Sequence, residues 1–406
     1  MTGVDIEDVR AAAEQFDDEI VERTPVDRSR SLGEMADAEV FLKMEHLQRT
    51  GSFKTRGASN KMASLRAADS VVERVVAASA GNHAQGVALA ASAADLDATI
   101  VMPQDAPQAK IDATREYGAE VVLHGRDFRT AMDHAESLAE ADRTEFVHAY
   151  DDPDIVAGQA TVGLEILDDV SDVDTVIVPI GGGGLIGGVG VALKALRPDV
   201  RLVGVQAESA ATVPRSLEKG EPYTEGEVDT IADGIATGGI ASLTLDLIDS
   251  HVDEVVTVSD GTIARGIILL MERAKQVVEG AGAAAVAPLV TDAIDVSGET
   301  VVPVLSGGNI DVSMLQTVLT HELTERNRLL QLRVLIDDQP GVLEEISGVA
   351  SDHSANIRTV HHYRANADLD VGEAYITFEM ETSGTEHAET IKRTIRDRGY
   401  EITQVN

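Results

Sequence analysis

Apolar residues along this chain form two kinds of pattern that alternate over most of its length. Alanine-rich or amphipathic stretches typical of helices separate short runs rich in valine and isoleucine, which are typical of buried strands. This alternation predicts an α/β fold of βαβ units, with parallel sheets covered by helices on both faces. The predicted strands lie at residues 75–79, 98–103, 120–125, 145–150, 175–180, 201–206, 254–259 and 300–306. Because eight strands are too many for one small sheet, we expect two α/β domains that share a cleft.

The pattern changes near residue 328. A predicted helix ends there, and the following residues alternate as β-α-β-β-α-β, which is the ferredoxin-like arrangement. We therefore divide the chain into residues 1–325, with a small subdomain at about 45–150, and an independent C-terminal module at residues 330–406.

Composition bounds the partners of the protein. Hydrophobic residues make up 43% of the chain, but aromatic residues only 3%, so Ala, Val, Ile and Leu must build the core. The formal net charge is −37, which repels nucleic acids and anionic membranes and excludes both as partners. Such acidity is also typical of proteins that stay soluble in concentrated salt, where charges are screened. We interpret it as a halophilic surface.

The absence of cysteine excludes a disulfide framework, a zinc site with Cys ligands and a thiol nucleophile. The first 20 residues are acidic and amphipathic, unlike a signal or transit peptide, and no uncharged apolar run is long enough to span a membrane. We expect a cytoplasmic protein.

The first candidate site is Lys54, which lies within the motif TGSFKTRGA at residues 50–58. This lysine, one of only eight in the chain, lies between glycines at the start of a predicted helix that follows a strand. Backbone dipoles at a helix N-terminus lower the pKa of a lysine and so favour the neutral amine that attacks an aldehyde cofactor. A solvated lysine after a Gly-Ser helix start is the alternative interpretation.

A second motif, SAGNHAQG at residues 79–86, lies where a predicted strand turns into a helix. Backbone N–H groups at such a turn can bind a carboxylate, and the amide of Asn82 can donate to a nearby oxygen. An ordinary N-cap explains Asn82 equally, and His83 by itself is typical of a packed or surface histidine.

A third motif, GGGGL at residues 181–185, also lies between a strand and a helix. Consecutive glycines free successive N–H groups to surround a phosphate. Gly182, Gly184 and Gly187 also satisfy the dinucleotide pattern G-x-G-x-x-G, and Glu208 follows the next strand. A nucleotide-dependent oxidoreductase is therefore a rival hypothesis, although it leaves Lys54 unexplained.

The fourth motif, SGGN at residues 306–309, follows the last strand of the alternating region. Ligands in α/β proteins bind at the carboxyl ends of parallel strands. The motifs that begin at Ser79, Gly181 and Ser306 all lie at such ends. We expect them to converge on one crevice.

Taken together, the four motifs resemble those of the threonine and serine dehydratases of the tryptophan-synthase-β-like fold, over about residues 10–320. The C-terminal module resembles an ACT domain, an amino-acid-binding regulatory unit, with DQPGVL at residues 338–343 as its entry loop. The resemblance implies a lyase that uses pyridoxal 5'-phosphate to convert an amino-acid substrate, threonine, into 2-oxobutanoate and ammonia.

The resemblance also implies a role for each motif residue. Lys54 forms the Schiff base with the cofactor and then acts as the base at the substrate Cα, while Phe53 packs against the cofactor ring. Asn82 bonds the 3-hydroxyl of the ring and Ser306 meets its pyridine nitrogen. Backbone N–H groups of Gly181, Gly182, Gly183, Gly184 and Leu185 hold the phosphate. The substrate carboxylate is held by Ser79, Ala80, Gly81, Asn82 and His83.

The implied chemistry depends on Ser306, because a hydroxyl cannot keep the pyridine nitrogen protonated as an aspartate would. The carbanion at Cα is then short-lived, which favours expulsion of the β-hydroxyl over transamination. The cofactor phosphate is the family's candidate for protonating that leaving group.

Three positions depart from the family or match only part of it. Ala80 stands where related serine racemases carry a second serine, which puts racemisation in doubt. Gln206 stands where many relatives have an acidic cation ligand, so we expect no metal. Glu279 matches a family motif near the cofactor, but a helix-end carboxylate explains it equally well.

In the C-terminal module, ACT domains bind effector amino acids near positions such as Gly341 and Asn356. We hypothesise that isoleucine or valine binds there and that the protein is a homo-oligomer, a dimer or tetramer. A purely structural oligomerisation module is the alternative. His361 and His362 are adjacent on a strand, point to opposite faces and are expected to face solvent. Serine racemase, threonine synthase, cysteine synthase and a non-catalytic amino-acid sensor are further alternatives for the whole chain.

Overall fold

The computed structural model describes residues 3–68, 71–226 and 228–405 of the chain. Two compact units are present, Met1–Asp311 and Val312–Asn406, and each has its own hydrophobic core. The sequence places the boundary between residues 325 and 330, whereas the second unit also includes the helix α13 (Val312–Glu325).

The first unit contains a six-stranded sheet in the order β1-β2-β10-β7-β8-β9. Its strands from β2 to β9 are parallel, as the alternation predicts, but β1 pairs antiparallel with β2. The reason is the short connection, residues 29–38, because a parallel crossover needs about a dozen residues or more. In sheet order, the strands are β1 (Val26–Arg28), β2 (Glu39–Lys43), β10 (Thr300–Pro303), β7 (Thr175–Pro179), β8 (Arg201–Ala207) and β9 (Glu254–Val258).

A second, four-stranded parallel sheet in the same unit has the order β5-β4-β3-β6. Its strands are β5 (Glu120–Leu123), β4 (Asp97–Met102), β3 (Arg74–Ala78) and β6 (Thr144–Phe146). All eight strands of the predicted alternation are present, in two sheets as expected. The run at 145–150, however, was predicted as one strand, and β6 ends at Phe146. The chain turns there because the ring nitrogen Nδ1 of His148 accepts the backbone N–H groups of Tyr150 and Asp151.

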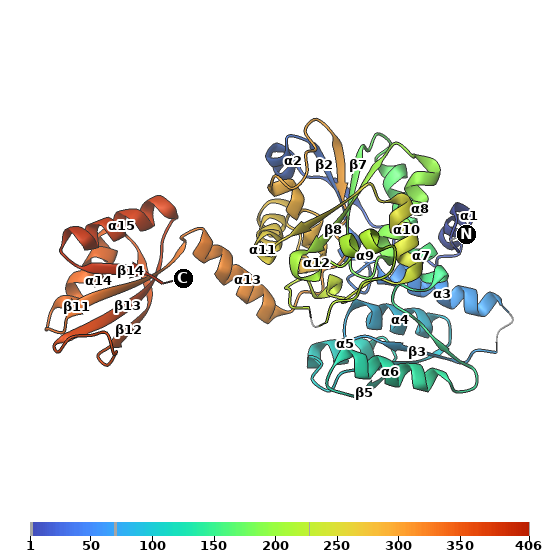
Figure 1. The fold of residues 1–406 in the computed structure, drawn as a ribbon, viewed down its shortest axis with the longest axis horizontal. Helices are drawn as coiled ribbons and strands as arrows, with labels where there is room; N and C mark the ends of the chain where they lie inside the picture. The colour runs from blue at the N-terminus through green and yellow to red at the C-terminus, as the bar shows by residue number, and fades with distance from the viewer. Residues whose placement is uncertain (1–2, 69–70, 227, 406) are drawn as a thin grey trace. The chain divides into compact units, whose positions relative to one another are not determined.

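Helices cover both faces of these sheets, which explains why the strands are apolar on both sides (Figure 1). Within β3, Val75 and Ala77 pack into one cluster with α4, whereas Val76 and Ala78 pack into another with α6. The clusters consist almost entirely of Val, Ile, Leu and Ala, as the composition predicts. The α-helices of this unit are α1 (Ile6–Glu14), α2 (Arg30–Ala36), α3 (Lys54–Ala67), α4 (Asn82–Ala93), α5 (Gln108–Glu116), α6 (Phe128–Ala139), α7 (Pro153–Asp169), α8 (Gly184–Leu196), α9 (Val213–Lys219), α10 (Ser242–His251), α11 (Asp260–Leu269) and α12 (Gly280–Ala284).

The second unit has the β-α-β-β-α-β order that the sequence predicts after residue 328. Its antiparallel sheet has the order β12-β13-β11-β14, and α14 and α15 pack against it through a core that includes Phe378 (Figure 1). Its elements after α13 are β11 (Leu329–Asp337), α14 (Val342–Asp352), β12 (Asn356–Tyr363), β13 (Glu373–Glu381), α15 (Thr385–Asp397) and β14 (Glu401–Gln404).

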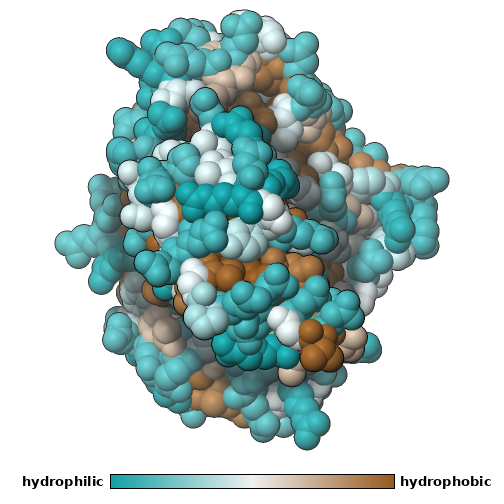
Figure 2. Space-filling model, turned by 90° about the vertical axis from the view of Figure 1, so that its left-hand side faces the viewer, coloured by the Kyte–Doolittle hydropathy of each residue, from teal (hydrophilic) through white to brown (hydrophobic). Residues whose placement is uncertain are grey.

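One face of the molecule is mainly polar. Figure 2 shows one face on which hydrophilic residues predominate and hydrophobic patches are small. Within the three described ranges, no helix is long and apolar enough to cross a membrane.

Candidate active site

Lys54 begins α3, as the sequence predicts, and its amine meets the segment after β6. The Nζ atom donates a hydrogen bond to the carbonyl oxygen of Ala149 at 2.9 Å and lies 5.2 Å from the centroid of the Phe53 ring. Burial lowers the pKa of Lys54 to about 8, so about a tenth of the amine is neutral at pH 7, far more than for an ordinary lysine. The sequence attributes this shift to helix dipoles, whereas in the structure loss of solvent is its cause.

The motif at 79–86 supplies the start of α4 and its close approach to Lys54. A Cβ atom on Gly86 would lie 3.1 Å from the backbone carbonyl carbon and oxygen of Lys54, so this position favours glycine. Gly81 is the N-cap of α4, and its own N–H donates to the Ser79 hydroxyl at 3.1 Å. No side chain caps the helix, so its first-turn N–H groups are available to a carboxylate.

His83 contributes its backbone to this turn, because its side chain is already committed elsewhere. The buried ring contacts the carbonyl oxygen of Val147 through Nε2 at 3.0 Å. Burial, together with the nearby positive charge of Lys54, lowers the pKa of His83 to about 3. The ring is therefore neutral at physiological pH and cannot act as a cationic clamp for a carboxylate.

The glycine motif connects β7 to α8, with Gly183 as N-cap at a positive φ of 89°. A Cβ atom on Gly182 would lie 2.1 Å from Cδ1 of Tyr150, so the aromatic ring rests directly on the loop. The first N–H groups of α8 have no carbonyl one turn earlier within the helix, and they form a candidate phosphate site. Since Tyr150 follows Ala149, one short segment contacts both the Lys54 amine and the glycine loop.

Two buried serines near Lys54 have unpartnered hydroxyl groups. Ser306 follows β10, is 2% exposed, and accepts the Phe53 N–H through its carbonyl, while its hydroxyl has no hydrogen-bond partner among the described residues. The Ser52 hydroxyl is fully buried and has no partner in the same described part of the chain. A fully buried hydroxyl without a partner is costly, as at Ser52, whereas the Ser306 oxygen is not fully buried and can meet a polar ligand.

The fourth motif and Glu279 meet the second motif through side-chain amides. Asn82 donates from Nδ2 to Oε1 of Glu279 at 2.7 Å, and its Oδ1 accepts from Nδ2 of Asn309 at 2.8 Å. The same nitrogen of Asn309 donates to the carbonyl oxygen of Thr50 at 2.7 Å. All four motifs thus lie around Lys54, including the three at strand ends that the sequence predicts to converge.

Glu279, which the sequence left between two roles, is a member of this site. It is the N-cap of α12, but its carboxylate makes no capping hydrogen bond and bonds Asn82 instead. Burial raises the pKa of Glu279 to about 7, partly offset by the hydrogen bond from Asn82. Its charge therefore changes near neutral pH.

Two residues of the rival oxidoreductase hypothesis, Gly187 and Glu208, lie outside the glycine loop. Gly187 packs against Leu247, since a Cβ atom there would be 3.0 Å from the leucine Cβ, and Glu208 is exposed on a short 3-10 helix (Glu208–Ala210). Gln206 holds that turn with its amide, accepting from the Val213 N–H at 2.9 Å and donating to the Ala210 carbonyl at 3.1 Å. Over the described residues, no group of three or more His, Asp or Glu side chains is arranged to hold a metal.

The two effector candidates in the second unit are not neighbours within one chain. Gly341 is the N-cap of α14 beyond the end of β11 at Asp337, with a φ of 98°, whereas Asn356 pairs with Glu381 at the other end of the sheet. Eight strand residues at about 3.3 Å each separate the two ends, or roughly 25 Å. His361 and His362 are both exposed, as predicted.

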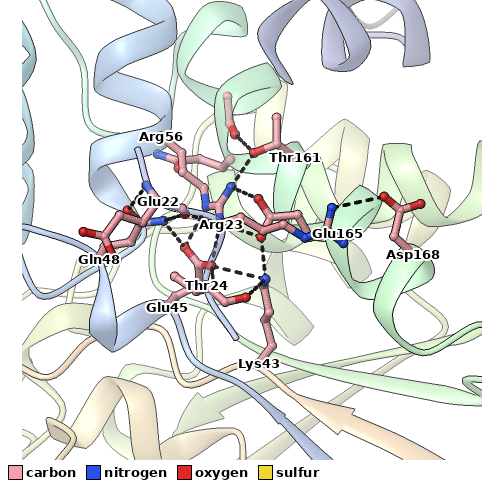
Figure 3. A network of polar contacts seen from close by, with 12 residues as sticks. Glu22, Arg23, Thr24, Lys43, Glu45, Gln48, Arg56, Thr161, Glu165 and Asp168 are labelled. Atoms are coloured by element: carbon pink, nitrogen blue, oxygen red, sulfur yellow. Dashed lines mark hydrogen bonds and ion pairs between the residues drawn. The ribbon is translucent and has the colours of Figure 1, made fainter. Parts of the chain in front are cut away.

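Sequence reasoning missed Arg56, the centre of a buried ionic network two residues after Lys54 (Figure 3). Its guanidinium is 0% exposed and donates to Glu45 at 2.7 Å and to Glu165 at 2.6 Å, while the buried Lys43 also pairs with Glu165. Two helix positions turn the chain by about 200°. Lys54 and Arg56 therefore point in nearly opposite directions, one toward the site and one into the interior.

Comparisons with known proteins show to which family the chain belongs. The profile of pyridoxal-phosphate-dependent enzymes matches residues 18–307. An L-threonine ammonia-lyase of Thermotoga maritima is 44% identical over 402 residues, which cover 98% of this chain and 99% of that protein. The structure of threonine deaminase isoform 2 from Solanum lycopersicum superposes with a TM-score of 0.73 and 35% identity, covering 78% of this chain and 86% of that one. Maize serine racemase has a TM-score of 0.73 and 33% identity, covering 80% and 99%.

Proposed function

Because this chain belongs to the family of pyridoxal-phosphate-dependent enzymes, we propose that it is a threonine ammonia-lyase, a lyase that converts L-threonine into 2-oxobutanoate and ammonia. The observation that carries the proposal is the Lys54 amine, which burial keeps partly neutral where all four motifs meet. The similarity to a threonine ammonia-lyase over nearly the whole chain supports this substrate class.

The residues present fit pyridoxal 5'-phosphate. Lys54 would hold the aldehyde carbon, and the first N–H groups of α8, with those of Gly181–Leu185, would hold the phosphate. The unpartnered hydroxyl of Ser306 would meet the pyridine nitrogen, and Asn82 has one N–H free for the 3-oxygen. Phe53 lies beside the Lys54 amine, where it would contact the ring.

When bound, the cofactor supplies a conjugated ring that accepts the electron pair left at the substrate Cα. Lys54 takes the proton from Cα, for which its amine must be neutral, and the lowered pKa favours that state. The Cβ–O bond then breaks, and the β-hydroxyl gains a proton and leaves as water. The released enamine hydrolyses to 2-oxobutanoate and ammonia, so no redox partner is consumed.

The first turn of α4 would orient the substrate. The N–H groups of Ser79 and Gly81 already donate to the Val101 carbonyl and the Ser79 hydroxyl, so those of Asn82 and His83 would bind the carboxylate. The neutral His83 ring stays on Val147. Ala80 carries no hydroxyl that could protonate Cα from the opposite face. This supports elimination over racemisation, which the shared fold with serine racemase leaves open. L-Serine also carries a β-hydroxyl, and we propose it as a second substrate that yields pyruvate.

The test uses the purified full chain with pyridoxal phosphate and L-threonine, and it measures 2-oxobutanoate. We expect turnover that Lys54→Ala abolishes without loss of folding, while Lys219→Ala, a surface lysine over the Tyr223 ring, retains it. Borohydride reduction and peptide mapping should find the cofactor on Lys54. Full turnover in Lys54→Ala, or cofactor attached to another lysine, contradicts the proposal.

We further propose that the second unit is an ACT-like regulatory module that binds isoleucine or valine. Its βαββαβ topology and the left-handed Gly341 at the start of α14 support this proposal. Because Gly341 and Asn356 lie at opposite ends of the sheet, a site that uses both needs two copies, which favours a homo-oligomer.

Regulation is tested by the rate of 2-oxobutanoate formation with and without L-isoleucine or L-valine, together with the molar mass in solution. We expect Gly341→Val to lose the response and keep the basal rate, and Gly348→Ala, in the same helix, to keep both. An oligomer with no response to either amino acid would leave only a structural oligomerisation module, and a monomer with no response would contradict both interpretations.

A further inference from the structure

Two side chains contact the amide of Asn82, one on each side, and together they fix where its oxygen and its nitrogen point. On one side Asn309 contacts its Oδ1, and on the other side Glu279 contacts its Nδ2. Asn82 comes from the small sheet, whereas Asn309 and Glu279 lie on segments of the large-sheet half. The contact therefore depends on how the two halves of this unit assemble.

The orientation of the Asn82 amide follows from a nearby atom that can only accept a hydrogen bond. The backbone carbonyl oxygen of Thr50 can only accept, so the Asn309 atom 2.7 Å from it must be the nitrogen. That nitrogen can only donate, so the Asn82 atom 2.8 Å away must be the oxygen. The nitrogen of Asn82 must then face Glu279, whose carboxylate oxygen accepts at 2.7 Å.

Two glycines make room for this arrangement. A Cβ atom on Gly51, whose φ is 74°, would lie 2.3 Å from Oδ1 of Asn309. A Cβ atom on Gly307 would lie 2.3 Å from Oε1 of Glu279. Both positions therefore favour glycine, one in the first motif and one in the fourth.

The amide nitrogen of Asn82 carries two hydrogens, and only one is used. Glu279 takes the first, and no acceptor among the described residues takes the second. Rotating the amide by half a turn would place its oxygen against the Glu279 carboxylate and its nitrogen against the Asn309 nitrogen. The contact between the two nitrogens would be repulsive, and so would the contact with Glu279 whenever its carboxyl is ionised. The free group that Asn82 offers to a ligand is therefore an N–H.

We propose that Asn309 and Glu279 are positioning residues that lock Asn82 as a hydrogen-bond donor, so that the site selects a ring oxygen that accepts, the ionised 3-oxygen of the cofactor. This inference rests on the proposed function, because it takes pyridoxal phosphate as the ligand of Lys54. Asn309 and Glu279 then contribute to cofactor recognition through their hydrogen bonds to Asn82, in addition to their packing.

The test compares two aldehydes, pyridoxal 5'-phosphate and its 3-deoxy analogue, which lacks only the ring oxygen. The dissociation constant of each aldehyde for the apo full chain is measured by equilibrium dialysis. The readout is the constant of the 3-deoxy analogue divided by the constant of pyridoxal 5'-phosphate. Asn309→Asp keeps the shape but replaces the donor by an acceptor, and we expect the ratio to fall about tenfold, the effect of one hydrogen bond to a charged group. Asn309→Ala, which removes the donor without adding charge, should lower the ratio by a smaller factor.

Asn60→Asp is the matched control. Asn60 is also a buried amide, which donates to the Asp154 carbonyl at 2.7 Å and accepts from Gln15, but it lies outside the site. We expect its ratio to equal that of the wild type, whatever stability it loses. An equal loss of affinity for both aldehydes in the Asn309 variants, or an unchanged ratio, overturns the proposal. If the wild type binds neither aldehyde at Lys54, the proposed function itself fails, which is a different result.

Discussion

The ε-amine of Lys54 donates a hydrogen bond to the carbonyl oxygen of Ala149 at a distance of 2.9 Å. The next residue, Tyr150, lies against Gly182 in the loop that we assign to the phosphate. A single segment after β6 therefore contacts both the amine and the glycine loop. Displacing this segment should disturb covalent attachment and phosphate binding together.

The first prediction concerns the pH dependence of the Lys54 amine. Only the neutral amine attacks an aldehyde, and burial lowers the pKa of Lys54 from its usual range near 10.4 to about 8. The rate at which the apo protein reacts with pyridoxal, the cofactor without phosphate, should rise with pH, with its midpoint near pH 8, and level off about one pH unit higher. Stopped-flow absorbance measures it, and a midpoint near that of an ordinary lysine would contradict the assignment of burial as the cause.

The second prediction concerns Gly182. Alanine there would place a Cβ atom 2.1 Å from the Tyr150 ring, so either the ring or the loop must move. We expect Gly182→Ala to weaken cofactor binding at least tenfold by equilibrium titration, and we expect the double variant Gly182→Ala/Tyr150→Ala to recover part of the loss. Gly348→Ala, where a Cβ atom meets nothing within 4 Å, should bind normally. Equal losses in the single and double variants would show that the ring contact is not the reason.

The third prediction concerns the stability of the buried network around Arg56 (Figure 3). Arg56→Met would leave the carboxylates of Glu45 and Glu165 without their main partner inside the protein. Removing one member of a buried ion pair typically costs about 3–5 kcal/mol. Urea unfolding of the variant should show a loss of that size in the free energy of unfolding, whereas Arg197→Met, which breaks the exposed pair with Asp199, should change it little. A small loss in Arg56→Met would indicate that water or rearrangement replaces the guanidinium.

The fourth prediction is the pH dependence that this network gives to stability. Burial raises the pKa of Glu45, but the charge and hydrogen bonds of Arg56 outweigh it and hold the pKa below its usual value. A depressed carboxyl pKa stabilises the fold above the unfolded value, about 4.3 for Glu, and the stabilisation is lost as pH falls through the folded pKa. Thermal unfolding between pH 6 and pH 3 should therefore show a steeper decline in the wild type than in Arg56→Met. Parallel curves would exclude Glu45 as the source.

The fifth prediction follows from the formal charge of −37. Mutual repulsion of so many carboxylates destabilises the compact state, and salt screens it, since the screening length is about 10 Å at 0.1 M and about 3 Å at 1 M. The midpoint of thermal unfolding should rise between low and molar KCl. A midpoint that does not change with salt would contradict the halophilic interpretation of the composition.

Most of the elements, and the positions of the motifs along them, could be predicted from local patterns in the chain. The periodicity of apolar residues is a local property, so it predicted the eight strands of the alternation, the ferredoxin-like module and the helix that begins at Lys54. It also placed three motifs at the carboxyl ends of strands. These ends are where ligands bind in α/β proteins, because the rest of a parallel strand is buried between helices.

Tertiary structure alone decided which atoms meet. Lys54 and Ala149 are 95 positions apart, and Asn82 and Asn309 are 227 apart, so no local pattern relates them. The antiparallel β1, the early end of β6 and the inward Arg56 likewise depend on neighbours that only the folded chain supplies. A hydrogen bond is made or lost within a few tenths of an ångström. In the first unit, the packing of the half with the four-stranded sheet against the half with the six-stranded sheet sets that distance.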